Sequence, residues 1–175
     1  MPKNIVILCD GTSNEISESR TNILRLYGCL RKNDDQIVYY DPGVGTFGGA
    51  NDWLKWTRKA KEVLGLATGW GLDQNVKETY RFLVENFDRG SKDREPDTIY
   101  IFGFSRGAYT ARVLAGFIHA FGIMTPVNLN LLDYAYRTYK GISDRDEPAN
   151  DSDDKTDPNA AFRTMRLYER ALDTF

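Results

Sequence analysis

The chain has 175 residues, 41% of them hydrophobic, and its 23 basic and 25 acidic side chains leave a formal net charge of −2. This length and composition are enough for one domain with an apolar core, and they exclude a chain that is disordered throughout. The near balance of charge gives no electrostatic reason to expect a nucleic acid or an anionic membrane surface as a partner.

The first predicted element is an apolar strand at residues 5–9, close to the N-terminus. The sequence shows no extended hydrophobic region of a secretory signal and no apolar run near the length of a membrane span. These features predict a cytoplasmic protein without a Sec-type signal or a transmembrane segment, and they leave non-Sec export open. Cys9 in this strand and Cys29 in the next predicted helix are expected to be reduced core residues.

Patterns of apolar residues predict the remaining elements. Strands are expected at 36–40 and 98–102, where β-branched and aromatic residues cluster between turn signals. Apolar residues at helical spacing predict further helices, at about 21–31, 52–64, 74–86, 108–118, 128–139 and 159–172.

Two of these helices carry more specific expectations. Asp73 stands directly before the helix at 74–86 and is a preferred capping residue, so we expect it to cap that helix. The buried face of the same helix is predicted to contain Val76, Tyr80, Leu83, Val84 and Phe87. The helix at 108–118 is expected to pack closely on a sheet through one face of mostly small residues, namely Ala108, Ala111, Ala115 and Ile118.

Strands that alternate with helices predict an α/β fold, in which a parallel sheet is covered by helices on both faces. Ligands of such folds bind at the carboxyl ends of the strands, where the winding reverses. The loops after the strands at 5–9 and 98–102 are therefore the expected site. Residues 143–158 hold seven acidic residues, two basic residues and two prolines, which predicts an acidic flexible loop.

The most informative motif is the GxSxG sequence Gly103-Phe104-Ser105-Arg106-Gly107. It follows a predicted strand and leads into a predicted helix, which is the context of a nucleophile elbow. In an elbow the serine lies on a sharp turn that projects its hydroxyl above the sheet, and the glycines leave room for the crowded backbone. Ser105 is therefore the candidate nucleophile, and the alternative is a structural serine turn.

The loop Asp10-Gly11-Thr12 follows the first predicted strand. If that strand lies between the other two, the loop sits beside Ser105. The backbone N–H of Arg106 and a second N–H from Gly11 or Thr12 would then form an oxyanion hole. The other interpretation is an ordinary turn in which Asp10 caps its own backbone, because Asp-Gly is common in turns. The residues leave both interpretations open.

The stretch Gly43–Gly48 matches GxGxxG between a predicted strand and a predicted helix, so a dinucleotide site has to be considered. Such a site needs a second strand soon afterwards, and the next convincing strand begins only at Thr98. The glycines fit better as a loop at the mouth of the serine site, with Gly43, Gly45 and Thr46 as candidate substrate contacts. Nearby aromatic residues form either a wall for an acyl chain or ordinary helix packing: Phe47, Trp53, Trp56 and Trp70.

Four segments in order resemble one family, the α/β-hydrolase domain named for type VI secretion phospholipase effectors: Cys9–Asn14, Tyr40–Thr46, Gly69–Asp73 and Gly103–Arg112. The resemblance covers nearly the whole chain. Members of this family are hydrolases of the Ser-Asp-His type, and those characterised cleave acyl esters of phospholipids.

The resemblance implies roles for several residues. Ser105 would be the nucleophile, Arg106 would lend an oxyanion N–H, and the Asp10-Gly11-Thr12 loop would line the site. The implied substrate is an ester or lipid of low molecular weight. No metal and no organic cofactor is implied.

The other members of the triad are expected later in the chain, because α/β-hydrolases follow the order Ser, then Asp or Glu, then His. The single histidine, His119, lies fourteen residues after Ser105 in the same predicted helix, about 21 Å along its axis, and is badly placed as its base. The strand at 98–102 would also form a bare apolar sheet edge. We therefore expect an incomplete α/β-hydrolase-like domain with three identifiable strands.

Such an incomplete domain would be an N-terminal fragment, a truncated reading frame, or a piece whose open edge is covered by a C-terminal half or a partner chain. The functional prediction is a serine hydrolase that cleaves carboxylic esters, with phospholipid acyl esters as the expected substrate, and that is inactive as an isolated chain. The alternative is a non-catalytic module that keeps the elbow for packing and binds a partner.

Overall fold

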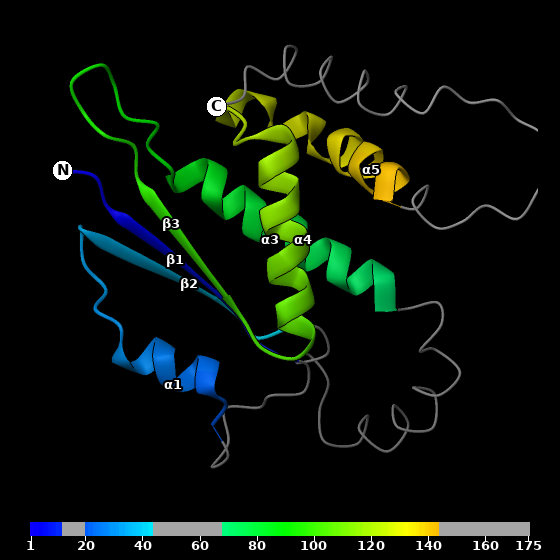
Figure 1. Cartoon of the computed structure of the whole chain (residues 1–175), viewed down its shortest axis with the longest axis horizontal. Coiled ribbons are helices and arrows are strands. Elements are labelled where there is room, and N and C mark those ends of the chain that lie inside the picture. The colour runs from blue at the N-terminus through cyan, green and yellow to red at the C-terminus, as the bar shows by residue number, and fades with distance from the viewer. Residues whose placement is uncertain (12–19, 44–67, 144–175) are drawn as a thin grey trace, which may run out of the picture.

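The computed structural model describes residues 1–11, 20–43 and 68–143. Thr12, Gly45, Thr46 and the predicted helices at 52–64 and 159–172 lie outside the described residues, as does the acidic segment apart from its first residue. In chain order the elements are β1 (Asn4–Cys9), α1 (Asn22–Cys29), β2 (Gln36–Asp41), α3 (Thr68–Asn86), β3 (Thr98–Gly103), α4 (Arg106–Phe121), the 3-10 helix η1 (Pro126–Leu131) and α5 (Leu132–Ser143) (Figure 1).

The strands form one parallel sheet in the order β2-β1-β3. Asn4 aligns with Gln36 on one side and with Thr98 on the other, and the pairing continues without a shift to the last residue of each strand. The predicted parallel sheet is therefore confirmed, with the first strand in the middle. All three strands end at the same edge, so the loops that follow them come together there.

Helices cover both faces of the sheet, as predicted. Ile5 and Ile7 face a core built with α3 and α4, whereas Val6 and Leu8 point the other way, toward Ile23 of α1. Figure 1 shows α1 apart from α3 and α4, with α5 beyond them. The chain leaves β1 toward one face and β2 toward the other, so the winding reverses at β1.

The helix α1 begins where the sequence predicts, and its first turn is capped by Thr21, whose hydroxyl accepts the Leu24 N–H at 3.0 Å. Of the two cysteines, Cys9 is buried as expected, but Cys29 is exposed, and the prediction for it was wrong. The apolar stripe of this helix runs through Ile23 and its neighbours one turn apart, and Cys29 lies off that stripe.

The helix α3 is longer than predicted, because it begins at Thr68 and contains Asp73 in its interior. Asp73 is therefore not a cap. Its carboxylate accepts the Tyr136 hydroxyl at 2.8 Å and lies 3.5 Å from the Lys140 ammonium, so it ties α3 to α5. The buried face of the helix is as predicted, with Val76, Tyr80, Leu83 and Val84 buried and Phe87 partly buried.

The helix α4 has a different buried face from the predicted one. Ala115 is exposed, and the buried stripe runs instead through Gly107, Thr110, Leu114, Phe117, Ala120 and Phe121. Phe117 stands in an aromatic cluster, 4.8 Å from the ring of Tyr80 and 5.5 Å from that of Tyr136. Large side chains of this stripe fill the space between α3 and α5, which the small residues would leave empty.

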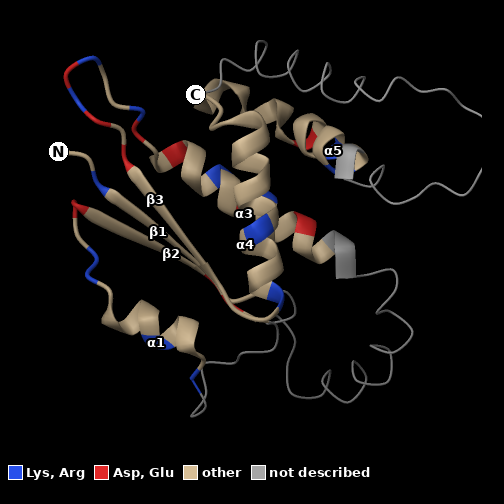
Figure 2. Ribbon diagram, viewed as in Figure 1, with Lys and Arg blue, Asp and Glu red and all other residues tan. Residues whose placement is uncertain are grey.

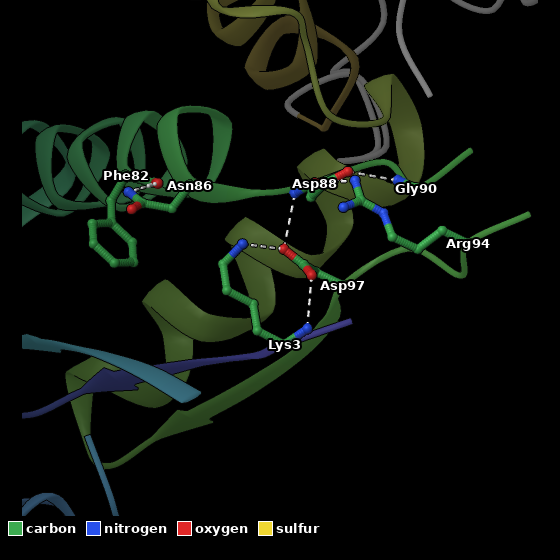
Figure 3. A network of polar contacts seen from close by, with 7 residues as sticks. All are labelled: Lys3, Phe82, Asn86, Asp88, Gly90, Arg94 and Asp97. Carbon is green, nitrogen blue, oxygen red and sulfur yellow. Dashed lines mark hydrogen bonds and ion pairs between the residues drawn. The ribbon is translucent and has the colours of Figure 1, made fainter. Parts of the chain in front are cut away.

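Charged residues lie mostly in the loops and on the helices, and the strands contain few of them (Figure 2). At the amino ends of the strands, buried Asp97 accepts the Lys3 N–H at 2.8 Å, the Lys3 ammonium at 2.5 Å and the Asp88 N–H at 2.9 Å (Figure 3). Arg94 pairs with Asp88 beside this network. These contacts tie the start of β1 to the start of β3.

In the described segments, no single helix has the length and apolar composition of a membrane span. Two consecutive helical segments together reach the length and apolar composition of a membrane span, but they bend by 112° at the break between them: Arg106–Phe121 and Pro126–Gly141.

Candidate active site

Ser105 lies at the sharp turn between β3 and α4. Its backbone angles are φ 54° and ψ −125°, and no other non-glycine residue in the described ranges has a positive φ. A side chain in this conformation costs about 1–3 kcal/mol, and such strain collects at functional sites. Ser105 is exposed, and its side chain makes no hydrogen bond to cap α4, although serine at this position commonly caps a helix.

Two glycines let this turn close on the end of β1. A Cβ atom on Gly103 would collide with the backbone of Gly107, and a Cβ atom on Gly107 would collide with the carbonyl oxygens of Cys9 and Asp10. The Phe104 N–H also donates to the Cys9 carbonyl at 3.0 Å. The first turn of α4 therefore lies directly on the residues where β1 ends.

The carboxylate of Asp10 is buried at this point and joins three segments of the chain. One of its oxygens accepts the Gly11 N–H at 2.7 Å. The other accepts the hydroxyl groups of Thr21, at 2.5 Å, and Tyr40, at 2.9 Å. The Asp10 N–H donates to the Asp41 carbonyl at 2.8 Å. Asp10 thus links the end of β1 to the end of β2 and to the start of α1.

These contacts bear on the two interpretations of the Asp10-Gly11-Thr12 loop. The loop lies beside the elbow, because Gly107 presses on the Asp10 carbonyl. It also contains the turn in which Asp10 caps its own backbone, since the Gly11 N–H is donated to the Asp10 carboxylate. That bond occupies the Gly11 N–H, one of the two candidates for the second oxyanion donor; the other candidate, Thr12, lies outside the described residues.

The loop after β2 packs against the other side of the Asp10-Gly11 backbone. Gly43 has φ 81°, and a Cβ atom there would lie 2.8 Å from the carbonyl oxygens of both Asp10 and Gly11. The Asp41 carboxylate holds this loop by accepting the Gly43 N–H at 2.9 Å, and it accepts the Asn75 amide of α3 at 2.9 and 3.0 Å. The Asp10-Gly11 backbone is therefore held between the β2 loop and the elbow.

Burial shifts the titration of the groups in this region. Burial raises the pKa of Asp41 above its usual value, against the lowering effect of the hydrogen bonds from Gly43 and Asn75. Burial and the Asp10 hydrogen bond raise the pKa of Tyr40. Burial and the charge of Asp41 raise the pKa of Cys9 to about 12, so its thiol stays protonated at neutral pH and is a poor nucleophile.

The groups that could assist Ser105 differ in position. His119 lies in the last turn of α4, at the opposite end of the helix from Ser105. Arg106 follows the serine, and burial lowers the pKa of its guanidinium. Phe104 and Tyr109, on either side of Ser105 in the sequence, are each 49% exposed. Within the described ranges, no three His, Cys, Asp or Glu side chains form a group that could hold a metal ion.

Sequence reasoning missed Thr21 and Tyr40 as parts of this region. Both hydroxyl groups bind the Asp10 carboxylate from segments that lie 11 and 30 residues away in the chain. A signal was present, because Thr21 stands before a predicted helix and Tyr40 belongs to one of the motif segments. That signal does not indicate that the two hydroxyl groups meet on one carboxylate.

The doubly wound sheet, with a strained serine at a strand-to-helix turn, defines an α/β domain, a class in which ligands bind at the carboxyl ends of the strands. The family described as "T6SS, Phospholipase effector Tle1-like, catalytic domain" matches residues 3–173, so the chain belongs to that family. The predicted family is confirmed. That family is described as the catalytic domain of a phospholipase effector.

A curated relative is the uncharacterized protein YEL023C of Saccharomyces cerevisiae, which is 35% identical over 147 residues. The match covers 79% of this chain and 20% of the relative, so the chain spans about a fifth of the length of the curated relative it matches. No solved structure matches the chain.

Proposed function

We propose that this chain carries the nucleophile and the oxyanion-binding part of a serine hydrolase that cleaves acyl esters of phospholipids. The observation that supports the proposal is the backbone of Ser105, which stays at a positive φ directly after β3 with its side chain exposed. A turn that needs only to reverse direction would use glycine here, because glycine carries no such cost. The family supplies the substrate class.

In the proposed reaction the Ser105 oxygen attacks the carbonyl carbon of the ester. The carbonyl electron pair moves onto its oxygen, and the backbone N–H groups of Arg106 and Thr12 stabilise that oxyanion. The serine proton passes to a general base and then to the departing alcohol, which leaves an acyl-enzyme for water to hydrolyse.

Asp10 is a positioning residue in this proposal, because its carboxylate sets the turn that brings the loop against the elbow. Thr21 and Tyr40 hold that carboxylate in place. The general base comes from polypeptide other than the described residues, since His119 lies at the wrong end of α4.

Fluorophosphonate labelling with added imidazole tests this proposal on the chain itself. The serine oxygen displaces fluoride from phosphorus, and imidazole takes the serine proton in place of the general base. We expect one phosphonyl group on Ser105, read by intact mass and peptide mapping, at a rate that rises with imidazole. Ser105→Ala should abolish this labelling, whereas Ser91→Ala, at an exposed serine of an ordinary turn, should leave it unchanged.

Two further comparisons complete the test. A dodecyl fluorophosphonate should react faster than an ethyl one if the site accepts an acyl chain. Equal labelling of wild type and Ser105→Ala, or label spread over several surface serines, would contradict the proposal. It would favour the second candidate function, a binding module whose elbow serves packing only.

A further inference from the structure

The carboxylate of Asp41 joins the loop after β2 to the helix α3. It accepts the Gly43 N–H at 2.9 Å and the side-chain amide of Asn75 at 2.9 and 3.0 Å. Asn75 comes 34 residues after Asp41, so the carboxylate bonds two segments that are far apart in the sequence. Because an ionised carboxylate only accepts hydrogen bonds, it also determines that the N–H groups of the Asn75 amide face it.

The helix α3 gives the Asn75 side chain a fixed position. The next residue, Val76, is buried in the core. About two turns further along the helix, the ring of Phe82 lies 4.6 Å from the ring of Tyr39 in β2. A group on a packed helix is held more precisely than a group on a loop. Asn75 is therefore a fixed donor that sets the position of the Asp41 carboxylate and of the loop bonded to it.

That loop packs against the backbone beside Ser105. A Cβ atom on Gly43 would lie 2.8 Å from the carbonyl oxygens of Asp10 and Gly11. The elbow touches the same backbone, because a Cβ atom on Gly107 would collide with the Asp10 carbonyl oxygen. Close-packed groups transmit a displacement to their neighbours. A shift of the loop after β2 would therefore move the Asp10-Gly11 backbone relative to the elbow.

Burial of the Asp41 carboxylate is unfavourable for stability. Burial raises its pKa, and its two hydrogen-bond donors lower that pKa only in part. The titratable groups that act electrostatically on it from the packed elements carry no positive charge: Cys9 and Asp10 of β1, Tyr39 and Tyr40 of β2, and Glu78 of α3. A neutral amide would fill the same volume without this cost, so stability alone does not account for a carboxylate here. Carboxylates in such surroundings concentrate at functional sites.

We propose that Asp41 and Asn75 are a positioning pair for Ser105. Together they hold the loop after β2 against the Asp10-Gly11 backbone, and this backbone sets the oxyanion-binding N–H groups at the elbow. The inference rests on the proposed hydrolase function, because it concerns the reactivity of Ser105. Neither member of the pair touches the reacting atoms. A change at Asn75 should therefore alter the reactivity of Ser105 without any change at the elbow itself.

Asn75→Asp tests the pair through the fluorophosphonate labelling of Ser105. The variant places a second carboxylate against Asp41, and two such groups repel each other unless they share a proton. We expect labelling at least about tenfold slower than in wild type at about pH 8, because the oxyanion donors are displaced. Gln74→Glu is the matched control, since it makes the same exchange of an amide for an acid at the exposed neighbouring residue. Its labelling rate should stay within about twofold of wild type.

Two further measurements separate positioning from a general loss of stability. Asp41→Asn combined with Asn75→Asp exchanges the two groups, so that the amide at position 41 accepts the Gly43 N–H and donates to the new carboxylate. Labelling by this double variant should return to within about threefold of wild type. The rate of Asn75→Asp relative to wild type should also rise as the pH falls from about 8 to about 6, because the two carboxylates then share a proton. The relative rate of Gln74→Glu should not change.

Two results would overturn the inference: equal labelling of wild type and Asn75→Asp, and slow labelling that the double variant does not restore. Thermal unfolding checks that each variant is folded. If Asn75→Asp is not, Asn75→Ala takes its place, because it removes the donor without adding a charge. We expect it to label at least about threefold more slowly than wild type.

Failure of the proposed function gives a different result, because wild type is then not labelled at Ser105. Hydrogen exchange tests the pair in that case. The Gly11 N–H is bonded to the Asp10 carboxylate and the Asp10 N–H to the Asp41 carbonyl, so both amides report on this backbone. They should exchange at least about tenfold faster in Asn75→Asp and recover in the double variant. Unchanged exchange in Asn75→Asp would overturn the inference.

Discussion

The two ends of the sheet each bury an aspartate that holds neighbouring segments together, but they compensate its charge differently. At the amino end, the side chain of Asp97 is 3% exposed and is paired with the Lys3 ammonium. At the carboxyl end, Asp41 is buried against neutral donors, the Gly43 N–H and the Asn75 amide. One end has a cation for its carboxylate, and the other has none among the contacts described.

The difference appears in the pKa values. Burial acts to raise the pKa of Asp97, but the hydrogen bonds and charge of Lys3, with the Asp88 N–H, bring it below its usual value. The pKa of Asp41 stays raised, because its neutral partners do not offset burial. The amino end is thus arranged for stability, whereas the carboxyl end combines the strain at Ser105, after β3, with a weakly compensated carboxylate at the end of β2.

The largest expected effect comes from Gly107→Ala, which would disrupt the carboxyl end. The new methyl group would collide with the backbone of Cys9 and Asp10, which cannot move without breaking β1. We expect a loss of about 3 kcal/mol in the free energy of unfolding, measured by urea titration. Gly28→Ala is the matched control, because no atom lies within 4 Å of a Cβ there, and it should be neutral or stabilising by up to about 1 kcal/mol.

The next effect tests the amino end. Asp97→Asn removes the charge that Lys3 faces in a buried position and should cost about 2 kcal/mol at pH 7. Asp133→Asn, which breaks the more exposed pair with Lys77, should cost at most about 0.5 kcal/mol. Similar losses in the two variants would contradict the contrast between buried and exposed pairs.

The pH dependence of the Asp97→Asn variant distinguishes the two ends of the sheet further. Because the folded pKa of Asp97 is lowered, its contribution is present above the unfolded value of about 3.9 and is lost as the pH falls through the folded value. Asp41 has the opposite sign: its contribution is present below about 3.9 and is lost as the pH rises through its raised value. Asp97→Asn should therefore flatten the acid limb of the stability curve.

A smaller effect, of opposite sign, is expected at Ser105. Ser105→Gly relieves the cost of a side chain at φ 54° and should stabilise the chain by about 1 kcal/mol after the added freedom of the unfolded glycine is counted. Ser91→Gly, in a turn where Ser91 has no positive φ, should give no gain. Thermal unfolding of the two variants measures the difference, and destabilisation by Ser105→Gly would show that the turn is not strained.

These contrasts also show what the sequence could predict. The three strands and the strand-to-helix turn at Ser105 were predictable, because each rests on a local pattern: apolar runs, and GxSxG between a strand and a helix. The strand order entered only as a condition, and the structure supplies it. The buried face of α4 was not, since Phe117 is buried by Tyr80 and Tyr136 from other helices. Asp73 resembled a cap for the same reason, because its partner Tyr136 lies 63 residues away.

The candidate site likewise has one feature that the sequence predicted and one that it did not. That the Asp10 loop would lie beside Ser105 was expected only if β1 lay between the other two strands, and the structure brings the two together through Gly107. The sequence did not predict that the Gly11 N–H is hydrogen-bonded to the Asp10 carboxylate, because the position of that carboxylate also depends on hydroxyl groups from Thr21 and Tyr40. Contacts of a buried polar group over such sequence distances carry no period that a pattern could detect.

The smallest expected effect tests that carboxylate directly. Tyr40→Phe keeps the ring that packs 5.4 Å from Tyr27 and removes the hydroxyl that donates to Asp10 at 2.9 Å. We expect a loss of somewhat under 1 kcal/mol at pH 7, measured by urea titration, because Asp10 keeps its other donors. The raised pKa of Tyr40 adds a contribution that is lost as the pH rises above about 10, so the variant should flatten the alkaline limb.

Tyr27→Phe is the control for this variant, since it changes the neighbouring ring in the same way without touching the Asp10 carboxylate. It should shift stability by no more than about 0.5 kcal/mol and leave the alkaline limb unchanged. If Tyr40→Phe and Tyr27→Phe behave alike, the Tyr40 hydroxyl adds nothing to the hold on Asp10. The loop beside Ser105 would then depend on Thr21 and on the close contacts of Gly43 and Gly107.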